Sequence, residues 1–209
     1  KVSPDSKFVF LVRDPRDNVI TCQNRKLGRH LNTAYQASHW NNYFANATKL
    51  RLEDESKFLL VKYEDLVIHP EQELKTICSF LDITFNEKML DFHSSFNNFI
   101  DSNKEGVDKE FMHNLKDFHS TLRKPLDSSK IGLWKKEDPS KIQLIEKVTH
   151  GVAKNMGYDF EEPNYKLSFS EKYYISLSTL QKKWLLKTYL RIPFGIKLWI
   201  KKIRKPYRK

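Results

Sequence analysis

The sequence predicts an α/β fold with a mainly parallel sheet, because two apolar strand segments are each followed by helix signals. Residues Phe8 to Val12 read Phe-Val-Phe-Leu-Val, and residues Phe58 to Lys62 read Phe-Leu-Leu-Val-Lys. Continuous apolar runs rich in aromatic and β-branched side chains are typical of strands buried on both faces of a parallel sheet. We therefore expect Phe8 to Val12 to be covered on both sides.

Each strand is followed by residues that favour the start of a helix. After the first strand, Asp14 can serve as an N-cap, Pro15 suits the first helical position, and Asp17 places an acid near the helix N-terminus. After the second strand, Tyr63-Glu64-Asp65 predicts a turn. A helix is then expected from Pro70 to about Leu81.

Helical patterns account for much of the remaining chain. Apolar spacing predicts a helix from Thr33 to Leu52, and Asp138-Pro139 predicts the start of another that ends at Gly157. The polar stretch from Asn98 to Lys130 predicts a long loop, which in a compact domain is either functional or disordered. We expect one domain over residues 1–160 and a basic, aromatic C-terminal extension over residues 161–209.

The net charge of +11 is confined to the end of the chain. Residues Lys172 to Lys209 contain 12 Lys and Arg and no Asp or Glu, so the rest of the chain has 25 basic and 26 acidic residues. A neutral body argues against nucleic acid as the partner of the domain. The tail could lie on an anionic membrane surface, or form a helix that packs on the domain with its charges in water.

The sequence from Lys1 predicts a cytoplasmic protein, with membrane association through the tail as the alternative. No apolar run is long enough to span a bilayer, and no signal peptide opens the sequence. Because the first residue is Lys1 and not Met, targeting information upstream would not be visible.

An anion site is expected at the end of the first strand. Ligands of open α/β sheets bind outside the carboxyl ends of the strands, where helix N-termini attract anions. Arg13 stands at this place, and Thr21 follows one to two turns into the next helix. A guanidinium and a hydroxyl suit a phosphate group. The alternative is that Arg13 forms a structural ion pair with Asp14 or Asp17.

The segment Arg13-Asp14-Pro15-Arg16-Asp17 with Thr21 resembles the 3'-phosphate-binding segment of sulfotransferases that use 3'-phosphoadenosine 5'-phosphosulfate. In that family, an Arg at the strand end and a Ser eight residues later hold the 3'-phosphate. Thr21 stands where the family has the Ser and keeps the hydroxyl. The resemblance implies a P-loop NTPase-like, three-layer fold that is incomplete at the N-terminus of this chain.

Three further segments resemble the family in the same order. Tyr63, in Phe58 to Asp65, matches the tyrosine near the adenine, although alone it would be a strand-end aromatic. Phe96, in His93-Ser94-Ser95-Phe96, matches a phenylalanine that stacks on the adenine, although it could equally be a core residue. Gly132, in Ile131 to Lys136, matches the Gly-x-Trp-Lys segment after the loop that closes over the nucleotide.

Ahead of Gly132, cytosolic members carry Arg-Lys-Gly against the 3'-phosphate. This chain has Ser128, Ser129 and Lys130 instead, as in bacterial and carbohydrate-type members. These residues would supply hydroxyls and charge to the phosphate. The alternative is Arg123 and Lys124, which would reach it only if the loop folds back.

The resemblance implies transfer of a sulfuryl group from 3'-phosphoadenosine 5'-phosphosulfate, as co-substrate and without a metal, to a hydroxyl or amine acceptor. The acceptor is expected to be a carbohydrate or a small metabolite. The glycine-rich loop for the 5'-phosphosulfate and the catalytic base are expected before Lys1, so the chain alone is expected to be inactive. The alternatives are a P-loop nucleotide kinase-like protein, and a nucleic-acid- or membrane-binding module that acts through the tail.

Overall fold

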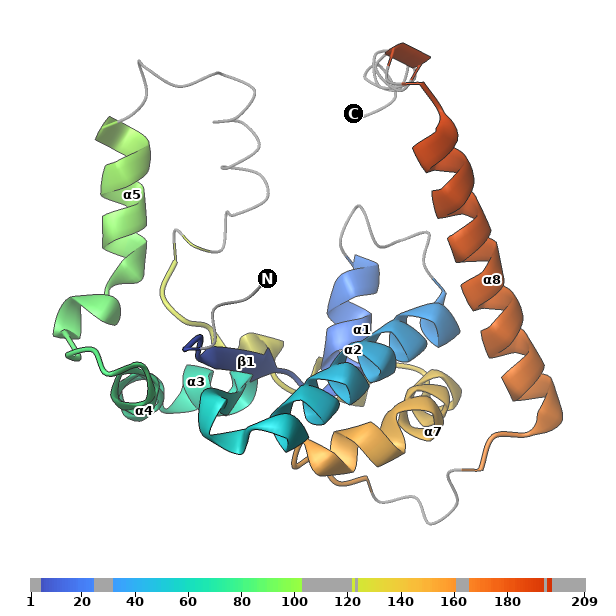
Figure 1. The fold of residues 1–209 in the computed structure, drawn as a ribbon, viewed down its shortest axis with the longest axis horizontal. Coiled ribbons are helices and arrows are strands. Elements are labelled where there is room, and N and C mark those ends of the chain that lie inside the picture. Colours follow the sequence, from blue (N-terminus) through green and yellow to red (C-terminus); the bar gives the residue numbers. More distant parts are fainter. Residues whose placement is uncertain are drawn as a thin grey trace.

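A computed structural model describes residues 5–24, 32–102, 122, 124–160, 166–193 and 195–196. Strands β1 (Phe8–Val12) and β2 (Phe58–Lys62) pair in parallel, in a register that places Phe8 beside Phe58 and Val12 beside Lys62. The rings of Phe8 and Phe58 stack with centroids 5.0 Å apart. The predicted α/β class and parallel pairing are confirmed, although helices dominate the described residues (Figure 1).

The described helices, in chain order, are α1 (Pro15–Asn24), α2 (Thr33–Glu53), α3 (Tyr63–Ile68), α4 (Pro70–Leu81), α5 (Phe92–Ser102), α7 (Pro139–Asn155) and α8 (Phe169–Arg191). Short 3₁₀ turns are η1 (Glu55–Lys57), η2 (Glu87–Met89), η4 (Ser128–Lys130) and η5 (Leu133–Lys136).

Most helices begin where the sequence predicts. At α1, Asp14 accepts a hydrogen bond from the backbone N–H of Arg16 at 2.8 Å, and at α7, Asp138 accepts one from Ser140 at 2.9 Å. One expectation is wrong: Tyr63-Glu64-Asp65 is the first turn of α3 and not a separate turn. Two acids suit a helix N-terminus, and the short helix buries Val67.

One face of the sheet packs against α2 and α7. Val12 of β1 forms a buried cluster with Trp40 and Phe44 of α2 and with Ala153 and Met156 at the end of α7. A second buried cluster joins α1, α2 and α7. Its members are Val19, Ile20, Ala37, Ile142 and Ile145. These contacts fix the carboxyl end of β1, and therefore Arg13, relative to the helices.

The other face of β1 is open, so the prediction of a strand buried on both faces is wrong. Val9 and Leu11 expose 38% and 51% of their surface in the described structure. The cause is the position of α4, which packs along β2, where Val61 is buried. Apolar composition therefore identified the strand but not how many of its faces are covered.

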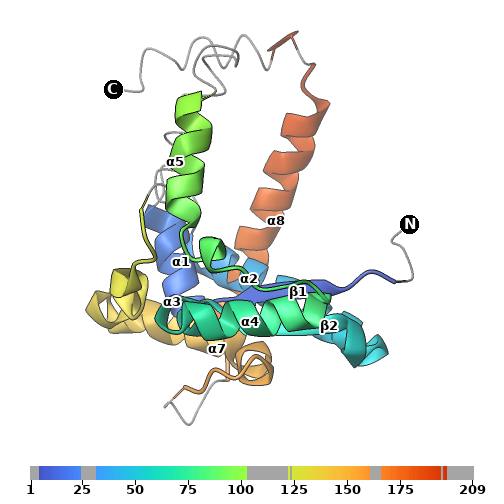
Figure 2. The same cartoon turned by 90° about the vertical axis from the view of Figure 1, so that its left-hand side faces the viewer.

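Helices α5 and α8 both project from the same side of the body in Figures 1 and 2, and Figure 1 shows them at opposite ends of it. Helix α8 contacts α2. The predicted division at residue 160 stays a prediction, because residues 161–165 lie outside the described ranges.

Candidate functional site

The candidate site lies where the two parallel strands end. Arg13 follows β1 and Tyr63 follows β2, so both reach the same edge of the sheet. The guanidinium carbon of Arg13 lies 4.6 Å from the centre of the Tyr63 ring, in a cation–π contact. Trp40 of α2 donates a hydrogen bond from Nε1 to the backbone oxygen of Arg13 at 3.1 Å. This bond holds the end of β1 in place.

Arg13 also joins the strand end to the predicted phosphate loop. Its Nη2 donates to the backbone oxygen of Lys130 in η4 at 2.5 Å, across 117 residues of sequence. Its Nε is buried and has no hydrogen-bond partner among the described residues. The guanidinium is therefore held in position while one of its donors is still unpaired.

Thr21 resembles Arg13 in having a buried polar atom that lacks a described hydrogen-bond partner. Its Oγ1 is buried and, within the part of the chain that the structure describes, makes no hydrogen bond. Thr21 lies one turn after Asp17 on the same face of α1, and Asp17 contacts the segment that follows η4. Buried polar atoms are nearly always paired, so two unpaired ones on two predicted site residues indicate a place for a polar ligand.

The loop of η4 is shaped by Asp127. The carboxylate of Asp127 accepts hydrogen bonds from the backbone N–H of Ser129 at 2.8 Å and from its hydroxyl at 2.6 Å. These bonds hold the pKa of Asp127 below its ordinary value. The side chains of Ser128 and Lys130 are exposed. Ser129 thus already donates its hydroxyl proton within the loop, whereas Ser128 and Lys130 extend into solvent.

Gly132 and Trp134 are tied to α1 through one buried carboxylate. Asp17 is only 1% exposed and accepts the backbone N–H groups of Gly132 at 2.7 Å and of Trp134 at 3.0 Å. Burial raises the pKa of Asp17, although these two hydrogen bonds act in the opposite direction. Gly132 has φ = 76°, a left-handed conformation that favours glycine. In this structure the N–H of Gly132 is used by Asp17, so Gly132 acts on the site by positioning the loop.

Arg16 forms a second polar centre that the sequence argument missed. Its guanidinium pairs with Asp14 at 2.6 Å and with Glu146 of α7 at 2.9 Å, and all three side chains are about nine-tenths buried. It also lies 3.9 Å above the Trp134 ring and 4.8 Å from the Phe160 ring. Burial lowers the pKa of Arg16, but the two carboxylates outweigh this and raise it. The alternating charges from Asp14 to Asp17 were the signal in the sequence that could have predicted this ion-pair centre.

Glu64 links both strand ends to the end of α7. It accepts a hydrogen bond from the backbone N–H of Asp14 at 3.0 Å and another from the hydroxyl of Tyr158 at 2.7 Å. Burial and this bond to Glu64 raise the pKa of Tyr158. The Tyr63-Glu64-Asp65 segment therefore contributes an aromatic ring to the site and a carboxylate to its support.

The structure separates the two interpretations of Arg13. The carboxylate of Asp14 is bonded to Arg16, and that of Asp17 to backbone N–H groups. Among the described residues, neither forms an ion pair with Arg13. The structural ion pairs of this segment are therefore made by Arg16.

The structure does not bring Phe96 to this place. Phe96 lies in α5, which in Figure 1 stands at the left of the body, away from α1. The adenine contact of Phe96 stays a prediction. Lys124 is exposed, and Arg123 lies outside the described ranges. The described residues contain no cluster of three or more His, Cys, Asp or Glu that could hold a metal ion.

Known proteins with similar sequences include protein-tyrosine sulfotransferases. A family model described as "Sulfotransferase family" matches residues 1–87. Protein-tyrosine sulfotransferase 1 of Danio rerio is 35% identical over 94 residues, which cover 43% of this chain and 26% of that protein. Protein-tyrosine sulfotransferase of Drosophila melanogaster is 33% identical over 100 residues, covering 46% of this chain and 20% of that protein.

A solved structure agrees with the sequence comparisons. The sulfotransferase domain of the Synechococcus PCC 7002 olefin synthase superposes with a TM-score of 0.52 and 25% identity, over 74% of this chain and 50% of that one. The chain is therefore similar to sulfotransferases in sequence and in fold. It spans about a fifth to a quarter of the length of the two animal relatives.

Proposed function

We propose that this chain supplies the 3'-phosphate- and adenosine-binding half of a sulfotransferase that uses 3'-phosphoadenosine 5'-phosphosulfate. The observation that carries the proposal concerns two buried polar atoms, Arg13 Nε and Thr21 Oγ1, on the two residues that the motif assigns to the phosphate. Neither atom has a hydrogen-bond partner among the described residues. A phosphate oxygen would accept from both groups. Each hydrogen bond to a charged group contributes about 1.5 to 3 kcal/mol.

The surroundings of Arg13 support an anionic ligand with an aromatic base. The guanidinium is held between the Tyr63 ring and the Lys130 carbonyl, so little conformational entropy is lost when a phosphate binds. Lys130 and Ser128 are free to close on the ligand from the solvent side. Tyr63 offers a ring at the end of β2 against which the nucleoside can pack.

We propose a hydroxyl as the acceptor, and a tyrosine side chain as the first to be tested. The sequence predicted a carbohydrate or a small metabolite, but both animal relatives above are named protein-tyrosine sulfotransferases. In the reaction, a base removes the acceptor proton while the acceptor oxygen forms a bond to sulfur. The bond from sulfur to the 5'-phosphate oxygen then breaks, and 3'-phosphoadenosine 5'-phosphate leaves.

Nucleotide binding tests the proposal directly. Replacement Arg13→Ala should weaken the binding of 3'-phosphoadenosine 5'-phosphate by roughly 2 to 4 kcal/mol in isothermal calorimetry, because charge-assisted contacts in a partly buried site are lost. The matched control is Arg51→Ala, since Arg51 is an exposed arginine paired with Glu55. Unchanged affinity in Arg13→Ala would contradict the assignment. Tighter binding of ATP than of the 3'-phosphorylated nucleotide would favour the kinase alternative.

The acceptor is tested separately, in the full-length protein with labelled donor. Tyrosine-containing peptides, sugars and simple phenols are offered in parallel. Labelling of the peptide alone supports the tyrosine acceptor, and labelling of the sugar alone restores the carbohydrate prediction. Neither result alters the nucleotide assignment, because calorimetry measures that site without an acceptor.

A further inference from the structure

Helix α8 has an apolar stripe on the side that faces away from the body. The stripe consists of five side chains that are 40% to 87% exposed: Phe169, Tyr173, Leu177, Leu180 and Trp184. Their spacing of three or four residues places them on one face of a helix. Exposure of aromatic and aliphatic side chains to water along four turns is energetically unfavourable, so we expect this face to bind a partner or a surface.

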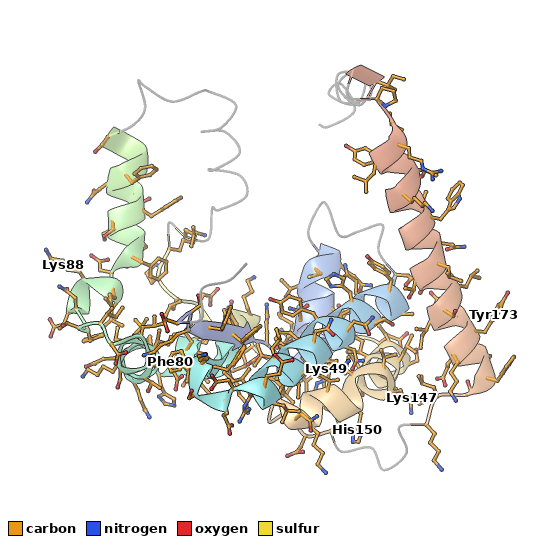
Figure 3. The ribbon with its side chains drawn as sticks, viewed as in Figure 1. Lys49, Phe80, Lys88, Lys147, His150 and Tyr173 are labelled. Carbon is orange, nitrogen blue, oxygen red and sulfur yellow. The ribbon has the colours of Figure 1, made fainter. Side chains whose placement is uncertain are left out.

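In the first half of α8, the opposite face attaches the helix to the body, whereas further along this face Leu185 and Tyr189 are 50% and 52% exposed. Ser178 is 3% exposed, and Glu171 in the first turn pairs with Lys147 of α7 at 2.9 Å. Glu171 also completes a capping box with Ser168, and hydrogen bonds from Ser168 and Lys147 hold its pKa at about 2. In Figure 3, Tyr173 points away from the body, whereas Lys147 lies on the body side of α8. The first turns of α8 therefore attach the helix, and the stripe is exposed in the described structure.

Basic residues extend the stripe toward the C-terminus. Lys187 and Arg191 are exposed and lie one and two turns after Trp184, on the same face of the helix. The sequence from Lys172 to Lys209 has 12 basic residues and no acidic one. The outward face therefore passes from aromatic to cationic along its length.

We propose that the outward face of α8 binds an anionic membrane surface, with the stripe in the headgroup region and the basic residues over acidic lipids. Trp and Tyr favour the membrane–water interface, and juxtamembrane Lys and Arg are attracted by acidic lipid headgroups. Of the helices in the described ranges, none is long and apolar enough to cross a bilayer. The helix therefore lies along the surface.

The charge and composition of this face favour a membrane over other occupants. A second copy would bring two strongly cationic segments together, which is unfavourable without acidic partners. Nucleic acid would satisfy the cations but would leave Leu177 and Leu180 solvated. An acidic lipid surface accepts both the cations and the apolar side chains.

Vesicle flotation of the full chain tests the proposal. The protein should bind vesicles of phosphatidylcholine with phosphatidylserine, and bind phosphatidylcholine alone much more weakly. The variant Tyr173→Ser/Leu180→Ser/Trp184→Ser should lose about tenfold or more in partitioning, because three apolar anchors are removed. Lys187→Glu/Arg191→Glu should reduce the preference for phosphatidylserine. Circular dichroism verifies that each variant is folded.

The control variant is Leu50→Ser/Leu52→Ser, which removes exposed apolar side chains at the end of α2 and should bind vesicles as the parent does. Equal partitioning of the triple variant and the parent would overturn the proposal. So would a dimer in sedimentation velocity that the triple variant abolishes, since that result assigns the stripe to a second copy. Quenching of tryptophan emission by brominated lipid should fall in Trp184→Phe; unchanged quenching would place the contact outside α8 and overturn the assignment.

Discussion

Arg13 and Arg16 stand three positions apart in one motif, yet the regions around them are opposite in character. Arg16 is surrounded on the packed side by two carboxylates and two aromatic rings, all from the protein itself. Arg13, on the strand-end side, has one carbonyl, one ring and a buried Nε without a partner in the described structure. The completed set of partners indicates a structural role for Arg16, and the incomplete set is consistent with the phosphate contact proposed for Arg13.

The comparison also explains why the motif contains so many charges. Among the described residues, Asp14 and Asp17 form no ion pair with Arg13: Asp14 binds Arg16, and Asp17 holds the loop at Gly132. The acids fix the backbone on either side of Arg13 without occupying its guanidinium. A rigid, charged donor at a strand end is then available to an anion.

The largest effect is expected from breaking the buried ion pairs of Arg16. Replacement Arg16→Met should lower the free energy of unfolding by about 3 to 5 kcal/mol, because the buried carboxylates of Asp14 and Glu146 would lose the guanidinium that pairs with both. Urea denaturation measures the change, with Arg51→Met at an exposed ion pair as the control. Adding Asp14→Asn and Glu146→Gln should recover part of the loss, and no recovery would contradict the charge argument.

A smaller effect is expected at the loop anchor. Replacement Asp17→Asn should lower the free energy of unfolding by about 2 kcal/mol, because the amide keeps one acceptor oxygen and turns an NH₂ group toward a backbone N–H donor. Nucleotide affinity should fall as well, since the loop of η4 would shift relative to Arg13. Urea denaturation and calorimetry on the same variant measure both changes. A loss of stability with unchanged affinity would show that the loop does not contribute to binding.

The sequence predicted the parts of this site that depend on local order along the chain. Strand ends, helix starts and the motif put Arg13 directly after β1 and Thr21 in α1, because caps and apolar runs are local signals. Tyr63 was correctly placed after β2, but as part of a turn and not as the first residue of α3. The burial of Arg16 by Glu146 and Phe160 could not be predicted, since it depends on how α7 packs. The open face of β1 was mispredicted for the same reason: a strand's composition does not specify which helices cover it.

The smallest effect is expected at Thr21, where stability and binding should change in opposite directions. In the free protein the buried Thr21 hydroxyl has no partner among the described residues, so Thr21→Val replaces it with a methyl group of the same shape. The free energy of unfolding should stay the same or rise by up to about 1 kcal/mol, while 3'-phosphoadenosine 5'-phosphate binding should weaken by about 1 kcal/mol or more. Thr21→Ser keeps the hydroxyl and should preserve binding. Thermal denaturation and calorimetry on both variants give the four values. If Thr21→Val lost stability and kept its affinity, the hydroxyl would belong to the structural side of the motif, together with Arg16.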